Sequence, residues 1–217
     1  MRYPYGMNLT TLIALLQACA QHKNLRKGKE IHAYILISGF LSSPLSTTSL
    51  INMYSKCNSI TDALTILDMS THHQNQNLFA YNAIVAGLIA NDMPRPALES
   101  YWRMRLAGIR PDNFTFPCVI KACTDVKEIL EGRKVHGLLF KFGLELDIFV
   151  GSALVHSYLK FGFTDEAHQL VEELPIRDVV LWNAMINGFA QIGQLGRALE
   201  ACKKMVEEGV VLSNFTV

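Results

Sequence analysis

The 217-residue sequence has few of the features that mark enzymes or membrane proteins. It contains no Gly-x-Ser-x-Gly, HExxH or CxxC motif, no glycine-rich phosphate loop and no His-x-Glu deaminase signature, so no catalytic or zinc centre is indicated. No run of 18 apolar residues occurs, so the sequence gives no sign of a membrane-spanning helix, and no membrane partner is expected. The formal net charge of +1 supplies no field that would attract a polyanion. The sequence therefore predicts a protein that is not an enzyme and needs no cofactor.

Cysteine, proline and glycine are also too scarce to define the fold. Seven prolines and 14 glycines exclude a collagen-like or disordered chain. The cysteines are odd in number and widely spaced, which favours buried thiols in a reducing compartment over disulfides or a metal site. They are Cys19, Cys57, Cys118, Cys123 and Cys202. Half of the residues are hydrophobic, which is ample for burial between stacked helices.

What the sequence does contain is a long internal repeat. Residues 9–70 are echoed by residues 113–174 at a constant offset of 104 positions, so that Ala18-Cys19 aligns with Ala122-Cys123 and His32 with His136. A second register, offset by 101, aligns Asn82 with Asn183. The difference of three residues is assigned to a short insertion near residues 70–76. Such periodicity predicts an array of structural repeats rather than one closed core.

Within each period the apolar spacing is helical. Ile84, Val85 and Leu88 form one apolar stripe, and a second stripe follows the segment 91–94. Asp92 is a candidate N-cap of that second helix, and Gly108 falls where a helix C-terminal glycine belongs. Each repeat is therefore expected to be a helical hairpin, and the predicted fold is an all-α, right-handed α-solenoid.

This pattern divides the chain into six repeats and two ends. The predicted boundaries are 1–8 (extension), 9–43, 44–77 (with the insertion), 78–112, 113–147, 148–178, 179–213 and 214–217 (the start of a further repeat). The repeat lengths are 35, 34, 35, 35, 31 and 35 residues. Because the last segment stops four residues into a new repeat, we expect the chain to be part of a longer array or a truncated product.

The repeats resemble the pentatricopeptide repeat, in the arrangement of the plant PLS subfamily. The segments that carry the resemblance are FAYNAI at 79–84 with MRLAGIRPD at 104–112, and VVLWNAMI at 179–186. Repeats 9–43 and 113–147 are similar to the long (L) type, 44–77 and 148–178 to the short (S) type, and 78–112 and 179–213 to the P type. The L-type repeats share Gly-Lys-x-Ile-His at 28–32 and Gly-Arg-x-Val-His at 132–136.

The resemblance implies sequence-specific binding of single-stranded organellar RNA, with one base read by each repeat. In the family the fifth and last residues of a repeat choose the base. In this chain the corresponding base-reading residues are Thr48 and Asn77, Asn82 and Asp112, Ser152 and Asp178, and Asn183 and Ser213. The second residue packs between bases, and the corresponding base-packing residues are Leu45, Phe79, Phe149 and Val180.

The same resemblance assigns adenine, uracil, guanine and cytosine to the four pairs in that order. The L-type repeats place Ile13 with Ser43, and Pro117 with Asp147, at the reading positions. Neither Ile13 nor Pro117 has a side-chain donor or acceptor, so both repeats are treated as spacers. The predicted preference is A-U-N-G-C, written 5′ to 3′.

The implied role is that of a specificity factor in organellar RNA editing (C-to-U) or other RNA processing. Editing-complex proteins would be further partners, and a mitochondrion, or alternatively a plastid, is the expected location. A deaminase-like tail, present in some relatives, is absent from this sequence.

Four alternatives stay open at this point. Asn82 and Asn183 could serve only as helix caps. The solenoid could be a peptide-binding scaffold of the tetratricopeptide type, or the chain could be a non-functional truncated fragment. Basic residues near the second helices, such as Lys27, Lys29 and Lys134, could contact phosphates or simply face water.

Overall fold

The protein is described by a computed structural model that covers residues 7–72 and 77–210, without the side chains of residues 71 and 72. These residues form twelve α-helices and one short 3₁₀ helix, η1 (Phe40–Ser42), and no strand. The first helices of the hairpins are α1 (Leu9–Gln21), α3 (Pro44–Lys56), α5 (Leu78–Ala90), α7 (Thr115–Asp125), α9 (Ile148–Lys160) and α11 (Val179–Gln191). The second helices are α2 (Leu25–Ile37), α4 (Ile60–His72), α6 (Pro94–Leu106), α8 (Ile129–Phe142), α10 (Thr164–Glu173) and α12 (Leu195–Glu207). The all-α prediction is confirmed.

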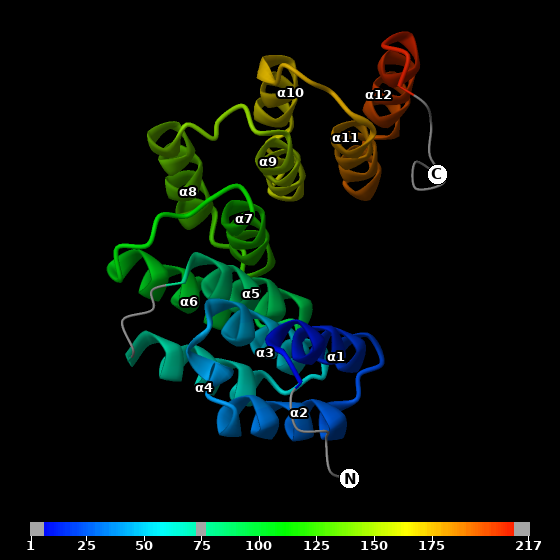
Figure 1. The fold of residues 1–217 in the computed structure, drawn as a ribbon. Helices are drawn as coiled ribbons and strands as arrows, with labels where there is room; N and C mark the ends of the chain where they lie inside the picture. Colours follow the sequence, from blue (N-terminus) through cyan, green and yellow to red (C-terminus); the bar gives the residue numbers. More distant parts are fainter. Residues whose placement is uncertain (1–6, 73–76, 211–217) are drawn as a thin grey trace. The chain divides into compact units, whose positions relative to one another are not determined.

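The helices form two compact bodies, an N-terminal half (residues 1–111) and a C-terminal half (residues 112–217). In the N-terminal half α3 packs between α1 and α5, and each of these first helices packs against the second helix that follows it (Figure 1). The C-terminal half repeats the arrangement, with α9 packed between α7 and α11. Each half therefore consists of helical hairpins whose first helices lie side by side.

Stability comes from packing between helices rather than from the helices themselves. The helices are 10 to 14 residues long, which is marginal for an isolated helix in water. The first helices supply most of the core: Leu50 on α3, Ile84 on α5 and Val155 on α9 are fully buried. By contrast, α12 buries only Ala198, Ala201 and Met205. The layer of first helices is thus the interior of each half. None of the helices in the described residues is long and apolar enough to cross a lipid bilayer.

The turn inside every hairpin has the same geometry. The second residue after each first helix has a positive φ, between 51° and 82°, and the six residues are Lys23, Asn58, Asp92, Lys127, Gly162 and Gly193. The amide of the next residue donates to a carbonyl five residues earlier at 2.9 Å, as from Met93 to Leu88, which is the Schellman closure of a helix end. The expectation that Asp92 caps α6 is wrong, because Met93 is the N-cap and Asp92 occupies the left-handed turn.

Two glycines at equivalent positions allow neighbouring first helices to approach closely. A Cβ added to Gly87 on α5 would lie 2.3 Å from the Ser55 hydroxyl oxygen of α3. A Cβ added to Gly188 on α11 would lie 2.4 Å from Cδ1 of Leu159 on α9. Both distances are far below van der Waals contact, so only glycine fits without a shift of the neighbouring side chain.

Histidines on the second helices α2 and α8 bond to the next first helix. His32 Nδ1 on α2 lies 2.9 Å from the Tyr54 hydroxyl on α3, and His136 Nδ1 on α8 lies 2.6 Å from the Tyr158 hydroxyl on α9. The rings of each pair also meet edge to face. This recurrence supports the interpretation of both histidines as packing residues rather than catalytic groups.

Candidate nucleic-acid interface

Each first helix after α1 carries an exposed apolar side chain near its N-terminus. Leu45 and Phe79 are 56% and 68% exposed in the N-terminal half. In the C-terminal half Phe149 and Val180 are 61% and 51% exposed. These are the four predicted base-packing residues. Because they recur at the same position of successive repeats, these side chains define the candidate interface.

Phe114 belongs to the same series and was missed. It lies next to the start of α7 and is 70% exposed, yet the repeat that contains it was treated only as a spacer. The signal was available in the sequence, because Phe114 is the second residue of its repeat, as Phe79 and Phe149 are of theirs. A repeat whose fifth residue reads no base can still offer an aromatic face.

The predicted last-residue readers are N-terminal caps of the following helix. Asn77 Oδ1 accepts from the Phe79 amide at 3.0 Å, and Asp178 Oδ1 accepts from the Val180 and Leu181 amides at 3.0 and 2.9 Å. Since the last residue of a repeat fills the cap position, the alternative in which Asn82 and Asn183 act as caps is wrong.

Asp112 and Asp147 cap in the same way in the C-terminal half. Asp112 Oδ1 accepts from the amides of Phe114 and Thr115 at 3.1 and 2.9 Å, and this turn delays the start of α7 to Thr115. Asp147 caps α9 through Oδ1, while its Oδ2 accepts from the side chain of Asn113 at 3.1 Å. Asp147 therefore uses one oxygen to hold a helix and the other to accept from Asn113.

In the repeat 44–77 the fifth and last residues lie side by side. The Asn77 side-chain amide donates to the Thr48 hydroxyl oxygen at 3.3 Å and to the Pro44 carbonyl at 3.2 Å. The Thr48 hydroxyl donates to the same carbonyl at 2.9 Å. Both side chains are half-buried, so a polar pair with fixed geometry stands beside the exposed Leu45.

The other fifth-position residues differ in exposure. Asn82 on α5 and Asn183 on α11 are half-buried. Ser152 on α9 is only 9% exposed, and its hydroxyl donates to the Ile148 carbonyl at 2.8 Å. Ser152 is the most enclosed of the predicted readers, because α9 packs between two other first helices. Ser213 lies outside the described residues.

In the two repeats predicted to be spacers, the fifth-position residues offer no polar group. Ile13 on α1 is 8% exposed and belongs to the core. Pro117 on α7 is half-buried, and its partner Asp147 is occupied by the cap and by Asn113. Ser43 precedes α3 without a side-chain cap bond.

Charges on the second helices are largely neutralised by ion pairs. Lys29 pairs with Asp62 at 3.0 Å, Lys27 with Glu30 at 2.8 Å and Lys134 with Glu131 at 3.2 Å; in addition Arg103 pairs with Asp68. These side chains are mostly exposed, so each pair contributes about 0–1 kcal/mol. The alternative in which this basic set faces phosphates is therefore less favoured than a solvated outer face.

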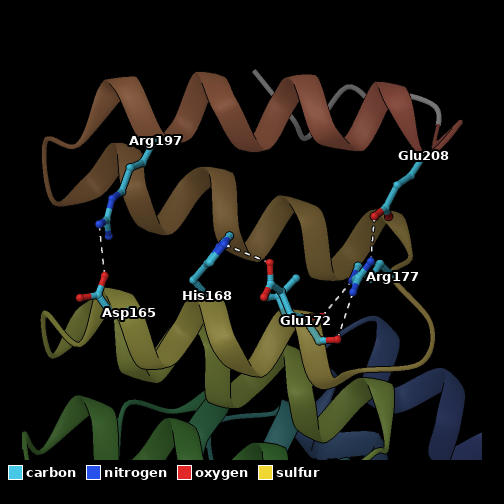
Figure 2. A network of polar contacts seen from close by, with 7 residues as sticks. Asp165, His168, Glu172, Arg177, Arg197 and Glu208 are labelled. Atoms are coloured by element: carbon cyan, nitrogen blue, oxygen red, sulfur yellow. Dashed lines mark hydrogen bonds and ion pairs between the residues drawn. The ribbon is translucent and has the colours of Figure 1, made fainter.

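In the C-terminal half the ion pairs connect α10 to α12. Figure 2 shows Arg197 of α12 directed toward Asp165 of α10, with 3.1 Å between the charged atoms. Arg177, in the connection between α10 and α11, pairs with Glu208 at 2.8 Å. Its guanidinium also donates to the Val171 and Glu172 carbonyls near the end of α10, which satisfies backbone acceptors that the helix leaves open.

The cysteines are poorly suited to nucleophilic chemistry. Burial raises the pKa of the Cys19, Cys57 and Cys118 thiols, and burial with nearby Glu131 and Glu128 raises the pKa of Cys123 to about 12. These thiols are therefore protonated at neutral pH, whereas the thiolate is the reactive form. No group of three His, Cys, Asp or Glu side chains in the described part of the chain could hold a metal ion.

Successive helical hairpins that stack through their first helices, with no strand among the described residues, define the class of α-solenoid repeat proteins. The model of the PPR repeat matches residues 46–70, 152–179 and 180–210. A pentatricopeptide repeat-containing protein of Arabidopsis thaliana is 44% identical over 212 residues, which cover 97% of this chain and 32% of that protein. The chain belongs to the pentatricopeptide repeat family.

Two further relatives come from Arabidopsis thaliana. One, named chloroplastic, is 31% identical, and the match covers 96% of this chain and 33% of that protein. The other, named mitochondrial, is 29% identical, and the match covers 97% of this chain and 27% of that protein. The chain thus spans about a third of the length of these relatives. Among solved structures, PPR10 in complex with an 18-nt psaJ RNA element has a TM-score of 0.78 at 19% identity, over 98% of this chain and 32% of that one. This likeness shows the fold.

Proposed function

We propose that this chain binds single-stranded RNA through the N-terminal ends of its first helices, with one base read by each repeat. The observation that carries the proposal is the recurrence at these ends of an exposed apolar side chain beside a polar cap residue, as with Val180 beside Asp178, whose cap bonds use only Oδ1. Aromatic and aliphatic faces stack on bases, and amide, hydroxyl and carboxylate groups bond base edges. The bound RNA in the structure of PPR10 supports the same assignment.

The proposed reading residues are those of the four pairs, with the preference A-U-N-G-C. The Thr48–Asn77 contact supports a pair that acts as one unit. Ser152 contributes least to discrimination, because it is only 9% exposed and its hydroxyl proton already bonds the Ile148 carbonyl. Phe114 adds a stacking face at the position without base preference, so this repeat binds a nucleotide of any identity.

In a cell this binding would direct an RNA-processing reaction to its site in an organelle. We propose C-to-U editing in the mitochondrion, with a plastid as the alternative, in a protein of the PLS arrangement. The chemistry would come from a deaminase domain or protein, since the thiols and histidines described above form no catalytic group. Relatives named for both organelles support an organellar location.

The proposal is tested by selection from a pool of random single-stranded RNA. We expect enrichment of A-U-N-G-C, and the Asn82→Ala variant should lose the uracil preference while the other positions keep theirs. Asn187→Ala, which alters an exposed amide one turn after the predicted reader Asn183 of α11, is the matched control and should leave the uracil preference unchanged. Binding to peptides but not to RNA would instead identify a protein-interaction scaffold.

A further inference from the structure

A cavity of about 380 Å³ lies between α7 and α9 in the C-terminal half. Its lining comes from first helices only. Residues four positions apart share one face of a helix, so Ser152, His156 and Lys160 form one stripe along α9. Pro117 and Lys121 begin the matching stripe on α7. The fifth-position residue Pro117 itself lines the cavity, which therefore continues the candidate interface away from the N-terminus of α7.

The charges in this cavity suit a singly charged anion. Lys121 Nζ lies 2.7 Å from Oδ2 of Asp125, one turn away on α7. Lys160 makes no ion pair within residues 7–72 and 77–210. With His156 neutral, the two ammonium groups and one carboxylate leave a net charge of +1 in the cavity, which matches one phosphodiester.

His156 is placed to respond to such an anion. Its imidazole is half-buried in the cavity wall. Burial is the main cause that lowers its pKa; Lys160 and Lys121 lower it further, and Asp125 opposes them. An anion between the lysines would offset their effect and favour the protonated imidazole.

The charged groups of the other helices packed on α9 act on residues other than His156. On α8, Arg133 acts on the pKa of Tyr158, and Glu131 pairs with Lys134. Helix α11 has no titratable residue. On α10, Asp165 pairs with Arg197 and His168 with Glu172. The two remaining carboxylates of α10 act on other residues. Glu166 influences the pKa of Tyr158, which lies on another face of α9, and Glu173 influences the pKa of His136.

We propose that Lys121, His156 and Lys160 form a phosphate site that binds a phosphodiester of RNA, and that His156 takes up a proton when the site fills. The inference rests on the proposed function and deepens it, because a repeat with no base preference becomes an anchor for the RNA backbone. Its consequence is proton-linked binding: if the pKa of His156 rises by one unit on binding, RNA binds about tenfold more tightly at low pH than at high pH.

The test compares RNA affinity at pH 6 and pH 8, at constant ionic strength, for the wild type, His156→Gln and His168→Gln. The control His168 lies on α10, outside this cavity. We expect the wild type and His168→Gln to gain several-fold in affinity at pH 6 and His156→Gln to gain markedly less. Lys160→Gln should weaken binding at both pH values and lower the slope of log affinity against log salt by about 1. An equal gain in His156→Gln overturns the inference.

A second measurement needs no variant. The imidazole resonances of His156 are titrated in the wild type alone, with single-stranded RNA, and with inorganic phosphate. A rise of the His156 pKa with RNA but not with phosphate supports the site; an equal rise with phosphate shows a site for free anions and overturns it. RNA binding without any such rise removes the proton linkage and leaves the proposed function standing, whereas no RNA binding at any pH removes both.

Discussion

His136 Nδ1 on α8 lies 2.6 Å from the hydroxyl of Tyr158 on α9, and the bond joins the second helix of one hairpin to the first helix of the next. The same contact joins His32 to Tyr54 in the N-terminal half at 2.9 Å. In both cases the two residues are 22 positions apart. A side-chain bond of this kind fixes how successive hairpins stack, and several measurable properties follow from it and from the contacts around it.

The first prediction concerns pH and stability. Burial is the main cause that lowers the pKa of His32 and His136 below the usual 6.5. The unfolded chain therefore binds more protons than the folded one as pH falls through 6.5, and stability decreases in that range. Urea unfolding at pH 7.5 and 5.5 should show this loss, and His136→Gln should reduce it. Tyr158→Phe is the control: it should cost about 0.5–1.5 kcal/mol at both pH values.

The second prediction concerns the close approach of α9 and α11. Gly188→Ala places a methyl group 2.4 Å from Leu159 Cδ1 and should lower the free energy of unfolding by about 1–3 kcal/mol. Gly196→Ala is the matched control, because a Cβ on this helical glycine of α12 meets nothing within 4 Å. It should raise stability by about 0.5–1 kcal/mol. Thermal unfolding of both variants measures the difference, and equal effects would contradict the packing described.

The third prediction separates capping from base reading at Asp178. Asp178→Ala removes the acceptor for two amides of α11 and should destabilise the protein by about 1 kcal/mol. Asp178→Asn keeps a cap acceptor and should change stability by only a few tenths of a kcal/mol. Both variants should alter the base preferred by the repeat 148–178 in an RNA selection. A destabilised Ala variant with unchanged RNA preference would leave Asp178 with the structural role alone.

The fourth prediction concerns the exposed aromatic side chains. Phe149 and Phe140 are 61% and 63% exposed in the same half, but only Phe149 lies at the start of a first helix. Phe149→Ala should weaken RNA binding by about 1–3 kcal/mol, as expected for the loss of one stacked base. Phe140→Ala, on α8, should leave affinity within twofold. Fluorescence anisotropy with labelled RNA provides the measurement, and equal losses would show that the contact is not specific to the helix start.

Most of the fold could be predicted from the repeat register. An offset of 104 residues that preserves helical spacing is compatible with few folds. The exposed positions of Leu45 and Phe79 likewise followed from their place in the repeat. The left-handed turn at Asp92 was misread, because Asp favours both caps and left-handed turns. That choice depends on the backbone closure between Leu88 and Met93.

Features that depend on two helices at once could not be read from periodicity. Ser152 has a polar side chain at a regular position, yet its enclosure results from packing on α9. The cavity between α7 and α9 likewise requires Lys121 and His156 to face each other from helices more than thirty residues apart in the chain. His156 belongs to no pattern visible in the sequence, because spacing along one helix does not show which helices will meet.

Under the proposed function, the last residue of several repeats both caps a helix and reads a base, which limits how the binding preference can evolve. Asn77, Asp147 and Asp178 hold a helix end with one atom while the rest of the side chain stays at the candidate interface. Only asparagine, aspartate, serine and threonine combine a short acceptor with a second hydrogen-bonding capacity. A change of the proposed target sequence is therefore limited to these four amino acids at this position. Other residues would leave the following helix without its side-chain cap.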